Sequence, residues 1–413
     1  MREAMKKQTV TSNKGTSEQK YLGDRGLLIF LVFLSAFAPL STDLYLPALP
    51  TMTTYFNVPE YLTNLTLILF FIFFSAGILI WGPLSDKYGR RPILLVGITG
   101  YAIASLLCAV SGSIYQLIFF RVLQALGGGS ASAVATAIVK DVYHERKREK
   151  TLALVQSMVI IVPAVAPVIG ALLLTFTSWR GVFIIQGILG VIILLGSIVF
   201  QETIEHRGSG NILHTLGRLG VVLKNPGFTS LLLIFSLSSI SGLAFISSSS
   251  YIYQNDFGTS SQIYSYFFAF NALAMLLGPL IYIKLSNHFK RFSIINLCFG
   301  ITILSGLAII LLGQSNPFIF ALALFPATLA GSCSRPPSAY LMLDQQAEDA
   351  GSASSLMGSF ATIMGSFGMI IISFNMDHLI PVIGGLNIIL GLLSGGLWLA
   401  VTKTPLLSKI REA

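Results

Sequence analysis

The sequence predicts an all-α membrane protein in which twelve spanning helices form two halves of six. The first observation is the composition. Of the 413 residues, 54% are hydrophobic and 10% are charged, whereas about a quarter of the residues of a soluble domain are charged. The second is the number of apolar segments that are long enough to cross a bilayer. The third is a sequence pattern that recurs in the two halves of the chain.

Twelve segments each provide about 20 apolar residues, the length that a helix needs to cross the hydrocarbon core. They lie near 26–50, 63–84, 92–111, 115–139, 151–175, 181–200, 226–250, 262–284, 291–313, 317–342, 352–375 and 380–402. We therefore expect a disordered N-terminal tail at 1–25, an N-terminal half at 26–200, a linker at 201–225, a C-terminal half at 226–402 and a tail at 403–413.

The basic residues indicate how the helices are oriented. The chain carries a net charge of +9, and its Lys and Arg residues cluster in the gaps after spans 2, 4, 6 and 8 and after span 12. The gaps after spans 1, 3, 7, 9 and 11 contain none. Because cytoplasmic loops are enriched in Lys and Arg, both termini and the linker are predicted to be cytoplasmic. This arrangement accounts for the positive charge without a nucleic-acid partner.

A repeat relates the two halves. Span 2 contains a Phe-Phe pair followed by Gly-Pro-Leu at 82–84, and span 8 contains the same elements with Gly-Pro-Leu at 278–280. In each case a basic turn leads into the next span. A parallel repeat of six helices is typical of transporters whose substrate binds in a central cavity between the halves.

The turn after span 2 reads GPLSDKYGRR over residues 82–91. Gly89 is expected to permit a sharp turn, and Gly82 a close approach between helices. Asp86 is expected to cap span 3 or to pair with a nearby arginine, with Arg90 and Arg91 available. Such a polar latch at the end of the bundle suits alternating access, because it can form in one state and break in the other.

This motif resembles the hallmark of the major facilitator superfamily, and the resemblance extends over nearly the whole chain. STDLYLPALP in span 1, RVLQALGGGSASA in span 4, SWRGVF before span 6 and GSASSLMGSF in span 11 resemble the bicyclomycin-resistance (Bcr/CflA) branch of drug:proton antiporters. The resemblance implies proton-driven export of bicyclomycin, phenicols and other small hydrophobic drugs across a bacterial cytoplasmic membrane. We expect a monomer in the lipid bilayer that uses the proton gradient and no cofactor.

Two charges lie at matched depth in the N-terminal half. Asp43 is about 10 Å before the predicted outer end of span 1, and Arg121 about 9 Å below the outer end of span 4, at 1.5 Å per residue. Ionisable groups inside a membrane usually face the bundle interior and have partners. The two could touch directly, through water or across a substrate, and Arg121 could instead reach the headgroups. The resemblance links the span 4 arginine to proton coupling, although Ala125 replaces the usual glycine of that motif.

Span 5 contains VPAVAPVIGA at residues 162–171. Only Pro167 and Gly170 match the family's antiporter motif strictly, and Pro163 is a second proline in the same helix. The prolines are expected to bend the helix. A bent and closely packed span 5 could seal the cavity against proton leak, as the resemblance implies, or could serve packing alone.

Further polar residues are candidates to line the cavity: Tyr45, Gln124, Gln156 and Asn271. Arg335 is expected near the cytoplasmic side of span 10, paired with Asp344 or a carbonyl group, with substrate contact as an alternative. Gly127, Gly128 and Gly129 in span 4 predict a close-packing face.

Other classes of function fit less well. The cysteines and histidines lack metal-binding spacing, and the chain has no P-loop, so neither a metal site nor direct ATP use is expected. A membrane enzyme would need a cluster of ionisable residues in a polar loop, and the longest internal polar segment has none. The chief alternative to a drug exporter is a carrier for a metabolite or sugar-like solute.

Overall fold

The computed structural model describes residues 19–143, 145–204, 212–346 and 350–404. In this part of the chain, twelve segments are helical, long and apolar enough to cross a membrane, as predicted. The first span differs from expectation because it is not one continuous helix. It consists of α2, a 3₁₀ turn η1 and a short helix α3, which together reach Phe56.

The N-terminal half contains the first six spans. Their elements are α2 (Gly23–Asp43), η1 (Leu46–Ala48), α3 (Leu49–Phe56), α4 (Glu60–Tyr88), α5 (Arg90–Ala109), α6 (Ile114–Val142), α7 (Glu145–Leu173) and α8 (Trp179–Val199). The C-terminal half contains α10 (Pro226–Tyr251), a π-helical turn η2 (Ile252–Asp256), α11 (Ser261–Ser286), α12 (Arg291–Leu312), α13 (Pro317–Asp344), α14 (Ala350–Ser373), η3 (Met376–His378) and α15 (Leu379–Val401).

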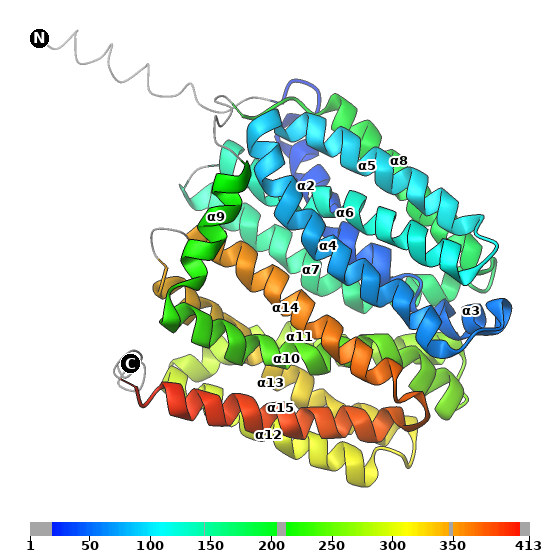
Figure 1. Ribbon diagram of the computed structural model, residues 1–413, viewed down its shortest axis with the longest axis vertical. Coiled ribbons are helices and arrows are strands. Elements are labelled where there is room, and N and C mark those ends of the chain that lie inside the picture. The colour runs from blue at the N-terminus through cyan, green and yellow to red at the C-terminus, as the bar shows by residue number, and fades with distance from the viewer. Residues whose placement is uncertain (1–18, 144, 205–211, 347–349, 405–413) are drawn as a thin grey trace, which may run out of the picture.

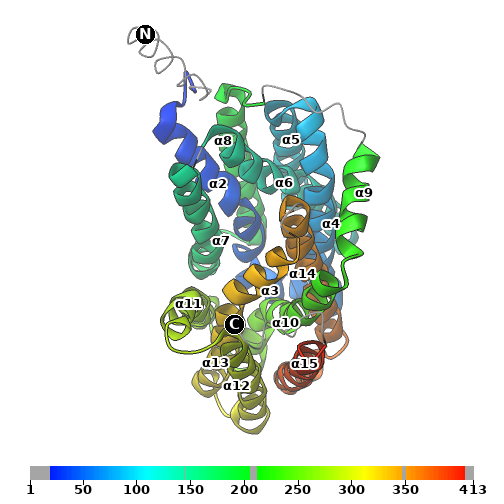
Figure 2. The same ribbon diagram turned by 90° about the vertical axis from the view of Figure 1, so that its left-hand side faces the viewer.

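The two sets of six helices form two groups. Viewed from one end, α2, α4, α5, α6, α7 and α8 lie on one side and α10–α15 on the other (Figure 2). The groups meet along two pairs of helices, α4 with α14 and α7 with α11. α2 begins and α15 ends at the same end of the bundle, which is the left-hand end in Figure 1. We call this end the predicted cytoplasmic end.

Two segments predicted to be irregular are partly ordered. The 201–225 linker contains helix α9 (Ile212–Leu223), which packs beside α4, α10 and α14 (Figure 1). Within the predicted tail at 1–25, Gln19 is buried and its side chain donates to the Gln201 carbonyl (3.0 Å). Residues 1–18, 205–211 and 405–413 lie outside the described part, so the predictions for them remain predictions.

Close helix packing in the N-terminal half depends on the span 4 glycines. A Cβ atom on Gly127 would lie 2.6 Å from the Gly97 carbonyl oxygen of α5, and one on Gly129 would lie 3.0 Å from the backbone of Gly77 in α4. Small residues let helix backbones approach in a membrane, where packing replaces the hydrophobic effect between helices. Helix α6 is thus held tightly between α4 and α5.

Candidate functional site

Helix α2 ends at Asp43, and the backbone changes course there. Pro39 lies inside the last turns of α2, and Pro47 lies in the 3₁₀ turn that follows. The Asp43 side chain is buried, with 4% of the residue exposed, and its Oδ1 accepts a hydrogen bond from the Thr42 hydroxyl (3.0 Å). The carboxyl group therefore lies at a break in a spanning helix, shielded from solvent.

Arg121 on α6 is fully buried. Its Nη1 donates to the Ser41 carbonyl (3.1 Å) and to Oε1 of Gln124 (2.6 Å), while Nη2 has no hydrogen-bond partner among the described residues. The guanidinium carbon lies 4.5 Å from the ring centroid of Tyr45 and 4.1 Å from that of Phe70. The cation thus lies within cation–π distance of two aromatic rings. Burial at this depth does not fit the alternative in which the side chain extends to the headgroups.

Gln124 joins Arg121 to a polar network inside the N-terminal half. Its amide nitrogen donates to Ser105 Oγ (2.7 Å) and to Oε1 of Gln186 (2.9 Å), and the Gln186 amide donates to the Ser41 carbonyl (3.2 Å). The network connects α2, α5, α6 and α8, so the Gln124 amide is directed into the half. Gln186 was not predicted from the sequence, although a glutamine inside an apolar span would have been a usable signal.

Asp43 and Arg121 do not form a direct ion pair in this conformation. Among the ion pairs of the described residues, none contains either side chain. Both are nevertheless tied to the end of α2, because Arg121 binds the Ser41 carbonyl two residues before Asp43. Direct contact, one of the three arrangements that the sequence leaves open, is therefore not adopted in this conformation.

The other cavity candidates lie in different surroundings. Tyr45 is fully buried, and its hydroxyl lies 3.1 Å from the Thr66 hydroxyl of α4. Asn271 on α11 is buried, and its side-chain oxygen has no hydrogen-bond partner within the described part of the chain. Gln156 belongs to α7, but its side chain lies outside the described residues.

The span 5 motif packs directly against the segment that contains Asp43. α7 remains helical through Pro163 and Pro167. A Cβ atom on Gly170 would lie 2.0 Å from the carbonyl oxygen of Leu44, the residue after Asp43. Gly170 therefore permits α7 to touch the backbone at the break in span 1.

The motif after span 2 forms a network of charges at the predicted cytoplasmic end. Arg90 Nη1 lies 2.5 Å from the Asp86 carboxylate, and its Nε lies 2.8 Å from Oδ2 of Asp141 at the end of α6. Asp141 also accepts from the Thr203 hydroxyl (3.2 Å). The Arg91 guanidinium donates to the Ile198 carbonyl (2.7 Å). Asp86 thus pairs with an arginine, and the pair extends to helices α6 and α8.

Glu202, not Asp86, caps the N-terminus of α5. Its two carboxylate oxygens accept from the backbone N–H groups of Arg90 (2.9 Å) and Arg91 (3.1 Å). Gly89 has φ +107°, and a Cβ atom there would clash with the Glu202 carboxylate. The expectation for Gly82 is wrong in this conformation, because a Cβ atom there would meet nothing within 4 Å. Glu202 could not be predicted as this cap from the sequence, because it lies 112 residues after Arg90.

The halves are joined at the end of the bundle opposite the described termini. Hydrogen bonds link Asn64 to Ser373 (3.1 Å) and Gln254 to the Pro47 carbonyl (3.0 Å). The largest apolar cluster also contains residues of both halves at this end, such as Leu49 and Tyr251. At the predicted cytoplasmic end, each half has an apolar cluster of its own.

Arg335 lies on a face of α13 that other residues cover only near the start of the helix. Ala321 and Leu324, near the start of α13, are each 3% exposed. Gly331 and Arg335 lie on the same face, since their spacing follows the helical repeat. A Cβ atom on Gly331 would meet nothing within 4 Å, and Arg335 is exposed. The predicted pairing of Arg335 with Asp344 is not among the ion pairs of the described residues.

Comparison with known proteins agrees with this architecture. The family model of the Major Facilitator Superfamily matches residues 31–369, a range that includes Asp43, Arg121 and the motif after span 2. The chain belongs to the major facilitator superfamily. Its members are transporters, and the chain is not an enzyme.

Two curated relatives cover most of the chain. The uncharacterized MFS-type transporter YdgK of Bacillus subtilis is 30% identical over 346 residues, which is 81% of this chain and 85% of the relative. The bicyclomycin resistance protein homolog of Haemophilus influenzae is 24% identical over 348 residues, or 80% of this chain and 84% of the relative.

A solved structure supports the fold. A bacterial homolog of the human lysosomal transporter Spinster, in an inward-facing and unoccupied conformation, superposes with a TM-score of 0.71. The match covers 93% of this chain and 97% of that structure at 16% identity. At this identity the likeness shows the shared fold.

Proposed function

We propose that this transporter exports small hydrophobic drugs in exchange for protons, by alternating access between its two halves. The observation that carries the proposal is the pair of buried and separated charges around the break in span 1. Asp43 accepts one hydrogen bond from Thr42, and Arg121 binds the Ser41 carbonyl while its Nη2 has no partner among the residues that the structure describes. A transporter that moves protons needs a shielded group whose charge can change.

Protonation of Asp43 relieves the cost of burying its charge. A carboxylate in an apolar environment is expensive unless a cation or several hydrogen-bond donors compensate it. In this conformation Asp43 has no cationic partner among the described ion pairs. The protonated form therefore suits this state, and the charged form suits a state in which a cationic group or water reaches the carboxylate.

Movement of the helix break would connect the proton to the rest of the molecule. The backbone around Asp43 touches Arg121 through the Ser41 carbonyl and touches α7 at Gly170. The turn that follows touches the other half through the bond from Gln254 to the Pro47 carbonyl. A change in charge at Asp43 can thus bias the contacts between the halves, which is what coupling requires.

The substrate class follows from the resemblance to the bicyclomycin-resistance branch, and the Haemophilus relative supports it. Aromatic rings lie close to the proposed coupling site, with Tyr45 and Phe70 against Arg121. These rings are fully buried in this conformation, so the proposed substrate class rests on the resemblance and on the relative. Bicyclomycin and phenicols are the compounds to test first.

Growth of a drug-hypersensitive bacterium on a panel of these compounds tests the proposal. Expression of the wild-type chain should protect several-fold against at least one compound, and an equally abundant Asp43→Asn variant should not. An Asp24→Asn variant is the matched control, because Asp24 lies at the surface and pairs with Lys147. No protection across the panel would contradict drug export and favour a metabolite or sugar-like solute.

A further inference from the structure

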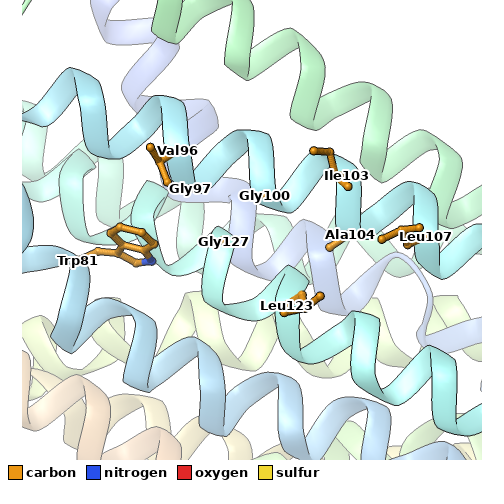
Figure 3. Close-up of a pocket in the computed structure, with 9 residues that line it drawn as sticks. All are labelled: Trp81, Val96, Gly97, Gly100, Ile103, Ala104, Leu107, Leu123 and Gly127. Carbon is orange, nitrogen blue, oxygen red and sulfur yellow. The ribbon is translucent and has the colours of Figure 1, made fainter.

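An apolar groove runs along the outside of the N-terminal half. Helices α4 and α5 form its walls, and α6 forms its floor through Leu123 and Gly127 (Figure 3). The groove has a volume of about 320 Å³. It exists because α4 and α5 each pack on α6 much more extensively than on one another.

The groove opens toward the surroundings of the bundle. Val96 and Ile103, which line it from α5, are 61% and 55% exposed. These side chains belong to spanning helices, so the medium in contact with them is the hydrocarbon of the bilayer. The groove therefore differs in place from the coupling site, which lies in the interior of the same half.

Particular residues keep the groove open. Gly100 faces it, and a Cβ atom there would meet nothing within 4 Å. The Trp81 indole forms part of its wall, and Nε1 of that ring donates to the Leu126 carbonyl of α6 (2.7 Å). This hydrogen bond satisfies the polar atom of the ring and leaves its apolar surface at the groove.

We propose that this groove binds one acyl chain of a phospholipid. Its lining reaches from Val96 to Leu107 of α5, a separation of eleven residues or about 17 Å along the helix axis at 1.5 Å per residue. Carbon and hydrogen make up nearly all of the lining, so a ligand gains contacts there only with an apolar chain. In a bilayer, the molecules that supply such chains at high concentration are the lipids themselves.

A cation lies where the headgroup of this lipid would be. Lys87 is exposed, and its Nζ lies 5.4 Å from the ring centroid of Tyr88. Tyr88 follows Trp81 by seven residues, or about two helical turns, so the two rings lie on the same face of α4, with Tyr88 nearer the predicted cytoplasmic end. Lysine and tyrosine are both suited to the interface between hydrocarbon and water. The bound lipid therefore belongs to that leaflet and carries an anionic headgroup.

Fluorescence quenching by brominated lipids tests the site. Purified full-length protein in detergent is titrated with phosphatidylglycerol that carries brominated acyl chains, and the Trp81 contribution is obtained by subtracting the signal of a Trp81→Phe variant. A bound chain predicts quenching that saturates at low lipid content. Quenching that rises only in proportion to the bulk lipid fraction would overturn the proposal.

Variants at two glycines separate binding in the groove from general contact with lipid. Gly100→Leu should fill the groove and remove the saturable quenching, and the smaller Gly100→Val should weaken it. Gly300→Leu is the matched control, because Gly300 occupies a similar position in α12 and also has nothing within 4 Å of a Cβ atom. Saturable quenching that survives in folded Gly100→Leu protein would place the lipid elsewhere.

The same titration tests the headgroup. Brominated phosphatidylglycerol should saturate at lower concentration than brominated phosphatidylcholine, and Lys87→Gln should remove that difference. Equal saturation by the two lipids in the wild-type protein would refute the contact between the anionic headgroup and Lys87.

Discussion

Arg121 is held both by hydrogen bonds and by contacts with aromatic rings. Two hydrogen bonds leave its Nη1 in different directions, and two aromatic rings lie against the guanidinium plane. The planar guanidinium suits this environment because it stacks on rings and donates in fixed directions, whereas a lysine ammonium is a compact and strongly hydrated charge. The site therefore requires the planar shape of the guanidinium as well as its positive charge.

Replacement of Arg121 by lysine should abolish most transport even though the charge remains. The ammonium would lose the stacking on Tyr45 and Phe70 and would leave Gln124 without its short hydrogen bond. Drug efflux from energised cells, measured at equal protein abundance, should fall at least tenfold, which corresponds to about 1.4 kcal/mol. Near-normal efflux by Arg121→Lys would show that charge alone suffices.

Substitution of Arg335 should change the stability of the protein less than substitution of Arg121. It is exposed on α13 and belongs to none of the described ion pairs. Arg335→Gln should change the free energy of unfolding by less than about 0.5 kcal/mol, as is usual for exposed residues without special contacts. Arg121→Gln should instead lower the thermal midpoint in detergent clearly. Similar losses in both variants would contradict the difference in their environments.

The residues at the site were predictable to different degrees. Asp43 and Arg121 could be predicted because a charge inside an apolar segment is conspicuous in one sequence. Their separation could not, because it depends on where Thr42 and Gln124 place hydrogen bonds in three dimensions. Gln186 was missed although a glutamine inside an apolar span was a usable signal, and its partners Gln124 and Ser41 could be identified only from the packed helices.

At the scale of the helix, α7 and the end of span 1 act as a packed pair. Gly170→Ala should disturb this pair, because its Cβ atom would overlap the Leu44 carbonyl. Overpacking of this kind costs about 1–3 kcal/mol. We expect a lower thermal midpoint and reduced efflux, whereas Gly385→Ala, with nothing within 4 Å of its Cβ atom, should resemble the wild type. Equal effects from both variants would rule out a specific contact at Gly170.

The cap on α5 gives a second prediction at this scale. Glu202→Ala removes the acceptor for two backbone N–H groups at the start of α5. The loss of a side-chain cap costs about 1 kcal/mol. The thermal midpoint of Glu202→Ala should therefore fall. The midpoint of Glu202→Gln should fall less, because glutamine keeps one good acceptor. An unchanged midpoint in Glu202→Ala would show that the cap contributes nothing measurable.

Hydropathy predicted the spans but not their irregularities. Twelve apolar runs suffice to find twelve spans, since a bilayer requires that length. The break after Asp43 was only suggested by Pro39 and Pro47, because proline shows where a helix can bend and not where it ends. Helix α9 was missed, since a short amphipathic helix in a polar linker has too little apolar length to resemble a span.

At the scale of the whole molecule, the two halves share an apolar cluster at one end and have separate clusters at the other. Alternating access requires the shared end to open. A short bifunctional thiol reagent that joins Asn64→Cys to Ser373→Cys should therefore stop transport, and thiol release of a cleavable form should restore it. Variants that carry only one of the two added cysteines are the controls, and they also report any reaction of the buried native residues Cys108, Cys298 and Cys333. Transport that continues in fully cross-linked protein would contradict opening at this end.

Proton movement in proteoliposomes that contain a pH-sensitive dye tests directly whether Asp43 carries the exchanged proton. With an imposed gradient of a drug that the protein exports, wild-type protein should move protons in the direction opposite to the drug, and Asp24→Asn protein should do the same. Asp43→Asn should abolish this drug-driven proton movement. Unchanged proton movement in Asp43→Asn would contradict the role of Asp43 as the proton-carrying group.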